Sequence, residues 1–152
     1  MGSRADRAVA YFKEGYNCSQ SVFLAFADKY GIDRELAARL SASFGAGIGR
    51  MREVCGAVNG MFMVVGLETG ATVGADQAGK AANYAKVQEF AAKVKEQTGG
   101  TIICRELLGL DKKALEKETP IPQTRTEQYY KKRPCVEMIR MAAQLLEEEY
   151  GE

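Results

Sequence analysis

Phe44–Gly60 reads FGAGIGRMREVCGAVNG, a glycine-rich loop that runs directly into an apolar segment. Gly45, Gly47 and Gly49 alternate with other residues, which allows positive φ values or a close approach of the backbone to a neighbour. Apolar residues then recur at three- and four-residue steps: Val54, Ala57, Val58, Met61, Val64 and Val65. A helix that is apolar around most of its circumference is buried in the core. We therefore expect a buried central helix at about 53–69.

Cys55 lies in the first turn of this predicted helix. The free N–H groups and the dipole at a helix start favour a negative charge there. The nearby Arg50 and Arg52 act in the same direction. We therefore expect the Cys55 thiol to ionise more easily than a free cysteine.

Further helices are predicted before and after this segment in the sequence. Asn17, with Gln20 three residues later, predicts an N-cap with a capping box, which places Cys18 in a first turn. Asp33 caps a short helix whose Leu36, Ala37 and Leu40 we expect to face inward. The remaining predicted helices begin near Ser3, Asp76, Thr101 and Pro134. No segment alternates like a strand, so the sequence predicts an all-α bundle of about six helices around the central one.

The polar stretch 111–133 separates the last two predicted helices. It carries two closely spaced prolines and few apolar residues, with at most one helical turn near Ala114. We interpret it as a long surface crossing within one domain that comprises residues 1–152.

Charge and composition exclude several classes of function. The net charge of +1 and the mixed distribution of charges argue against nucleic acid and anionic lipid as partners. The absence of histidine excludes Cys-His and Ser-His-Asp hydrolases, and also histidine metal ligands. The N-terminus lacks the apolar core of a signal peptide, and the run Met61–Val65 is much shorter than the roughly 20 residues of a membrane span. We expect a soluble cytoplasmic protein.

The four cysteines, Cys18, Cys55, Cys104 and Cys135, are each predicted in the first turn of a different helix. If these helix starts point at one place, the site would favour thiolates or a thiolate-bound cluster, with Arg50, Arg52, Arg105 and Arg133 nearby. In a reducing compartment, structural disulfides are not expected. The spacing does not match C-x-x-C zinc knuckles or a thioredoxin-type pair. A buried cysteine can also be a small apolar filler, so this interpretation stays open.

Gly45, Gly47 and Gly49 are also weak candidates for cofactor binding, because glycine-rich loops cradle phosphates. No strand precedes them, however, and no P-loop lysine with a hydroxyl residue follows. Packing is the favoured role of these glycines.

Taken together, these motifs resemble the family of redox-active proteins named for the pattern C_GCAxxG_C_C. The matching elements are Cys18 in YNCSQS, Cys55–Gly60 as CGAVNG with the preceding FGAGIGRM, Cys104 in CREL and Cys135 in RPC. The resemblance implies a small, mainly helical redox protein defined by its four cysteines. Related domains occur in cytochrome-type electron transfer, which would suit a thiolate-bound iron centre, but the chain has no C-x-x-C-H for haem attachment.

Three functions follow from these observations. The first is a thiol-dependent oxidoreductase in which Cys55 is the reactive thiolate and Cys18, Cys104 or Cys135 resolves it as a disulfide. The second is an electron-transfer module in which all four cysteines bind an iron–sulfur cluster or zinc. The third is a helical interaction module with buried thiols. The redox partner, the cysteine pairing and the oligomeric state do not follow from the sequence.

Overall fold

The structure is a computed structural model that describes residues 3–151, apart from the side chains of residues 131 and 132. The helices, in chain order, are α1 (Arg4–Lys13), α2 (Cys18–Ala27), α3 (Arg34–Ser41), α4 (Gly45–Ile48), α5 (Gly56–Thr69), α6 (Gln77–Thr98), α7 (Cys104–Leu107), α8 (Lys112–Glu116), α9 (Glu127–Lys132) and α10 (Cys135–Tyr150), with 3-10 turns η1 (Asp28–Tyr30) and η2 (Ala42–Phe44). In this part of the chain the sole β pairing is an isolated bridge. The all-α prediction is confirmed.

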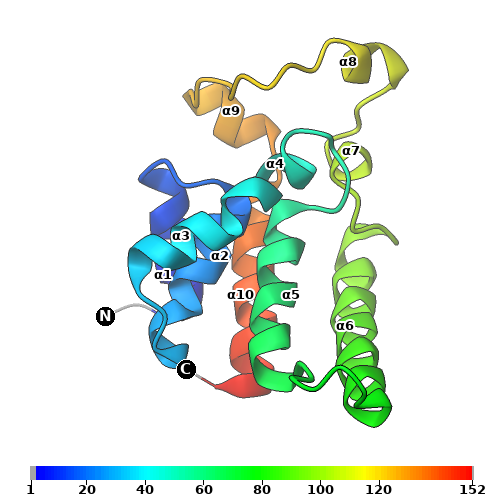
Figure 1. Ribbon diagram of the computed structural model, residues 1–152. Helices are drawn as coiled ribbons and strands as arrows, with labels where there is room; N and C mark the ends of the chain where they lie inside the picture. Colours follow the sequence, from blue (N-terminus) through cyan, green and yellow to red (C-terminus); the bar gives the residue numbers. More distant parts are fainter. Residues whose placement is uncertain (1–2, 152) are drawn as a thin grey trace.

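The helix α5 forms the centre of the bundle, as predicted, although it begins at Gly56. It packs against α2 and α10 on one side and α6 on the other (Figure 1). The largest fully buried side chains include Phe12, Phe26, Phe90 and Ile139, which come from four surrounding helices. Each such side chain contributes about 1.5–3 kcal/mol through removal from water. Hydrophobic burial around α5 therefore holds the bundle together.

The starts of α1 and α2 are fixed by local hydrogen bonds that the sequence predicts. Ser3 and Asn17 each accept a hydrogen bond from the third helical residue, and that residue's side chain accepts one from the cap, so both capping boxes are complete. Such a cap contributes about 1 kcal/mol to helix stability. The cap at Asn17 makes Cys18 the first residue of α2.

Gly60 sets the distance between α2 and α5. A methyl group added at Gly60 would lie 2.7 Å from the main-chain oxygen of Ser19. Real side chains do not tolerate such a distance to backbone, so only glycine permits this approach. The close contact brings the start of α2, with Cys18, next to the start of α5.

The predicted inward face of α3 is partly wrong. In α3, Leu36 and Leu40 are 49% and 51% exposed, whereas Ala37 is buried. The reason is that α3 contacts the bundle through one narrow side against α2. In α6, which lies at the edge of the bundle (Figure 1), Phe90 and Val94 are buried but Tyr84 is exposed.

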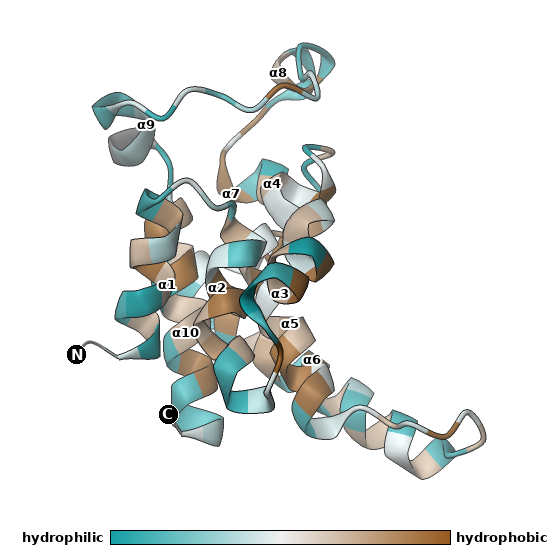
Figure 2. Ribbon diagram, turned by 60° about the vertical axis from the view of Figure 1, so that its left-hand side comes forward, coloured by the Kyte–Doolittle hydropathy of each residue, from teal (hydrophilic) through white to brown (hydrophobic). Residues whose placement is uncertain are grey.

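The polar stretch 111–133, which we call the strap, arches over the end of the bundle at which α4 lies (Figure 1). It contains α8, at the predicted turn near Ala114, and α9, which was not predicted. Hydrophilic residues line much of it, whereas hydrophobic residues gather on the bundle helices (Figure 2). Arg125 ties the strap down by donating hydrogen bonds to the main-chain oxygens of Phe12, Gly15 and Tyr16.

Among the described helices, none combines the length and the apolar composition that crossing a membrane would require.

Candidate functional site

The glycine-rich loop folds into a left-handed turn beside the helix starts. Residues 46–50 all have φ between +55° and +69°, and the N–H of Gly49 donates to the oxygen of Gly45 over 3.0 Å. The positive φ expected for Gly47 and Gly49 is confirmed. Gly45 has a negative φ and is instead needed for close packing, because an added methyl group would lie 2.2 Å from Cγ of Asn17.

Left-handed conformation is costly for residues other than glycine, about 1–2 kcal/mol each. Ala46, Ile48 and Arg50 nevertheless adopt it. A strained backbone conformation of this kind persists where contacts with the surrounding structure hold the residues in place. Here the contact is tight, because a methyl group at Gly47 would lie 2.7 Å from Cβ of Cys104. The turn is therefore packed directly against one of the four cysteines.

All four cysteines line one cavity of about 290 Å³. Cys18, Cys104 and Cys135 are the first residues of α2, α7 and α10, and Cys55 is the residue that precedes α5. The prediction of a first-turn position is confirmed for Cys18, Cys104 and Cys135, whereas Cys55 is the N-cap of α5. The structure brings the four helix starts together. The loop glycines Gly45, Gly47 and Gly49 line the same cavity.

Backbone pairing holds the segments that carry Cys55 and Cys104 next to each other. Val54 and Ile103, the residues that precede them, form the isolated antiparallel bridge. The N–H of Cys55 donates to the oxygen of Ile102 over 2.8 Å, and the N–H of Cys104 donates to the oxygen of Glu53 over 2.6 Å. Main-chain hydrogen bonds therefore fix the backbone of these two residues.

The other two cysteines, Cys18 and Cys135, contact each other through their side chains. The Cys18 thiol donates a hydrogen bond to the Cys135 sulfur, which lowers the pKa of Cys135 to about 7. Burial opposes this shift, while the charge of Arg133 and a hydrogen bond from Tyr129 support it. The same hydrogen bond to Cys135 raises the pKa of Cys18 well above its ordinary value. The pair therefore holds one acidic thiol and one thiol that keeps its proton.

The expectation that Cys55 ionises easily is wrong. Burial raises the pKa of Cys55 to about 12, although the N–H groups of Val58 and Ala57 act in the opposite direction. The helix start does favour the thiolate, but removal from water costs more. Burial also raises the pKa of Cys104, against a hydrogen bond from Arg52.

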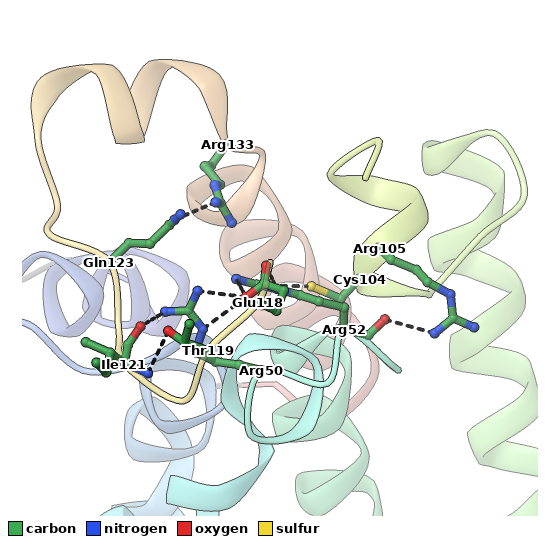
Figure 3. Close-up of polar contacts among 9 residues, drawn as sticks. All are labelled: Arg50, Arg52, Cys104, Arg105, Glu118, Thr119, Ile121, Gln123 and Arg133. Carbon is green, nitrogen blue, oxygen red and sulfur yellow. Dashed lines mark hydrogen bonds and ion pairs between the residues drawn. The ribbon is translucent and has the colours of Figure 1, made fainter. Parts of the chain in front are cut away.

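Arg50 and Arg52 were expected to favour a negative charge on Cys55, but both pair with Glu118 of the strap (Figure 3). Arg50 Nη2 lies 2.7 Å and Arg52 Nε lies 2.9 Å from its carboxylate oxygens. Arg52 Nη1 also lies 3.7 Å from Sγ of Cys104. Burial opposes ionisation of Glu118, but these hydrogen bonds outweigh it and lower the pKa of the carboxyl. The arginines thus connect the strap to one wall of the cavity.

Arg105 and Arg133, the other two arginines predicted near the thiols, have different positions relative to the cavity. Arg105 pairs with Glu53 over 3.0 Å and is not among the residues that line the cavity. Arg133 lines the cavity, donates to the side chain of Gln123 (Figure 3) and lies over the ring of Tyr129.

The sequence did not identify Glu118, Arg125 or Tyr129 as parts of this site. All three lie in the strap, and the partners of Glu118 and Arg125 are far away in the sequence, whereas Tyr129 lies near Cys135 in the sequence. No local pattern marks such residues, because their role depends on how the strap is folded back over the bundle.

Within residues 3–151, no three or more cysteine or acidic side chains are positioned to share one metal ion. The four cysteines are free thiols, and the iron–sulfur or zinc site stays a prediction.

A comparison with protein families matches residues 16–149 to the family described as "Putative redox-active protein (C_GCAxxG_C_C)". This match includes all four cysteines and the glycine-rich loop. Comparisons with curated proteins and with solved structures give no match.

Proposed function

Since the chain belongs to the C_GCAxxG_C_C family of redox-active proteins, we propose that Cys18 and Cys135 are a dithiol pair that transfers two electrons to a low-molecular-weight disulfide. The observation that carries the proposal is that Cys18 and Cys135, the first residues of α2 and α10, line the same cavity, and the lowered pKa of Cys135 supports it. Cys135 replaces Cys55 as the attacking residue, because Cys55 keeps its proton at neutral pH.

The reaction has two steps that follow from this geometry. The Cys135 thiolate attacks one sulfur of the disulfide R–S–S–R′, so that a Cys135–S–S–R bond forms and R′–S⁻ leaves. Cys18 then loses its proton to a leaving thiolate and attacks the Cys135 sulfur, which releases R–S⁻. The products are a Cys18–Cys135 disulfide and two small thiols, so two electrons pass from the protein to the substrate.

The acidity of each thiol suits its step. An attacking thiol works best when its pKa is close to the ambient pH, and Cys135 meets this condition with a pKa of about 7. The largest cause of the raised pKa of Cys18 is its hydrogen bond to Cys135. This contribution disappears once the Cys135 sulfur is part of a mixed disulfide, so Cys18 ionises more easily when it has to attack.

Single serine variants test this assignment. We expect reduced Cys18→Ser to form a stable mixed disulfide at Cys135 with bis(2-hydroxyethyl) disulfide, detectable by intact mass and peptide mapping. Cys135→Ser should lose the fast reaction. Cys104→Ser serves as the matched control and should react at the wild-type rate. A fast reaction that persists in Cys135→Ser would contradict the proposal.

A further inference from the structure

The cavity that holds the thiols carries more positive than negative charge. Four arginines line it: Arg50, Arg52, Arg125 and Arg133. Among the described residues, one carboxylate, Glu118, forms ion pairs with this set, and it is shared by two of the four guanidinium groups. Four guanidinium groups and one carboxylate leave three positive charges in excess, of which the Cys135 thiolate offsets one.

The four arginines differ in exposure and in existing partners, and therefore in their ability to bind a ligand. Arg50 and Arg52 are 12% and 5% exposed and are held by Glu118. Arg125 is held by main-chain oxygens at the end of α1. Arg133 is half-buried, and the contacts described for it are a neutral amide and an aromatic ring. A planar guanidinium with such neutral partners can still bind a carboxylate through two parallel hydrogen bonds.

The size and the remaining lining restrict the ligand further. A cavity of about 290 Å³ lies just below the usual range for small-molecule sites, which favours a small ligand. Pro120 and Pro122 of the strap and Met138 of α10 add apolar surface. This combination suits a short aliphatic molecule with a charged end.

We propose that the cavity selects small organic disulfides that carry an anionic group, and that Arg133 binds this group. The inference rests on the proposed function, since it assigns the substrate class of the same thiol pair. Arg133 and Cys135 line the same cavity and are two residues apart in the sequence, so a short molecule can contact the guanidinium while one of its sulfurs reaches the attacking thiol. The surrounding low dielectric strengthens the ion pair relative to water.

Three disulfides of similar size and different charge test this inference on the reduced full-length protein. They are 3,3′-dithiodipropionate, which is anionic, bis(2-hydroxyethyl) disulfide, which is neutral, and cystamine, which is cationic. Each rate constant is divided by that of 2-mercaptoethanol with the same disulfide, which removes intrinsic reactivity. We expect the normalised rate to be about tenfold higher for the anionic than for the neutral probe, the effect of one charge-assisted contact, and lowest for cystamine.

The variant Arg133→Gln should bring the ratio of anionic to neutral rates close to one. Its reaction with the neutral probe reports whether the fold and the thiol pair are intact, because the loss of Arg133 also makes Cys135 less acidic and slows all probes alike. Arg140→Gln, which changes an arginine paired with Asp6 on the outer face of α10, should keep the wild-type ratio.

The outcomes separate the two proposals. Fast reaction with all three probes at equal normalised rates, or a preference for cystamine, would overturn the anionic substrate class but leave the dithiol function intact. An unchanged ratio in Arg133→Gln would overturn the role of Arg133. Slow reaction with every probe would overturn the proposed function itself, and with it this inference.

Discussion

Cys135 and Cys55 occupy similar positions at the start of a long helix, yet their pKa values shift in opposite directions. Both are at least partly removed from water, which opposes ionisation in each case. Cys135 differs because it accepts a hydrogen bond from Cys18 and lies near Arg133. At the scale of a residue, the partner of a thiol therefore decides its acidity more than its place in a helix.

Removing these partners should raise the pKa of Cys135 in a defined order. Cys18→Ala removes the largest contribution and should raise it most, whereas Tyr129→Phe removes a smaller one and should raise it less. The ultraviolet absorbance of the thiolate, followed against pH in the reduced protein, measures both. Tyr130→Phe is the control, because Tyr130 packs on Phe12 and should leave the titration unchanged. A larger shift for Tyr129→Phe than for Cys18→Ala would contradict this order.

At the scale of an element, the close approach of α2 to α5 positions Cys18. This approach depends on Gly60, where an added methyl group would lie 2.7 Å from the backbone of α2. Another glycine of the same helix, Gly66, has open space around it. Alanine substitutions at Gly60 and Gly66 therefore distinguish the effect of close helix packing on stability from the effect of helix propensity.

We expect Gly60→Ala to lower the free energy of unfolding by about 2–3 kcal/mol, as overpacking typically does. Gly66→Ala should raise it by roughly 0.5–1 kcal/mol, because alanine favours a helix over glycine. Urea denaturation of both variants measures the difference. Equal effects of the two substitutions would show that α2 and α5 are not in close contact.

The strap is a second element, and Glu118 is one of its anchors, beside Arg125. The carboxylate of Glu118 neutralises Arg50 and Arg52, whose side chains are largely buried. Removing one partner of a buried ion pair leaves charge without compensation, which is more costly than losing a surface pair.

We therefore expect Glu118→Gln to destabilise the protein by about 1.5–3 kcal/mol, the range for hydrogen bonds to charged groups, and to speed hydrogen exchange in residues 111–133. The neighbouring Glu116→Gln, at an exposed position of α8, should do neither. Exchange in the strap that stays at the wild-type rate in Glu118→Gln would argue against this anchor.

At the scale of the whole molecule, the thiols link stability to pH. The pKa of Cys135 falls from 9.0 to about 7 on folding, so the unfolded chain binds more protons between these values. Stability should then rise as pH increases from about 7 to 9, by up to about 3 kcal/mol, and this gain is lost as pH falls through 7.

Above pH 9 the sign reverses, because Cys18, Cys55 and Cys104 have raised pKa values and stay protonated in the fold while the unfolded chain ionises. Urea denaturation of the reduced protein across this range checks both slopes. Cys135→Ser should lose the rise between pH 7 and 9. A rise that persists in this variant would mean that another group is responsible, although no histidine is available for it.

The parts of the fold that the sequence predicts are those with local causes. Asn17 caps α2 through its own neighbours, and the apolar residues of α5 predict burial from their spacing alone. Leu36 is different, because its exposure depends on how little of α3 the bundle covers. The contact of Glu118 with Arg52 and the pairing of Cys18 with Cys135 are also long-range, so no local pattern could identify them.

The most direct test of the account is the identity of the first disulfide. The reduced protein is treated with one equivalent of bis(2-hydroxyethyl) disulfide, the remaining thiols are blocked, and the disulfide-linked peptides are identified by mass spectrometry. The account predicts a Cys18–Cys135 linkage, with Cys55 and Cys104 recovered as blocked thiols. A first linkage between Cys55 and Cys104, or between one residue of each pair, would contradict it.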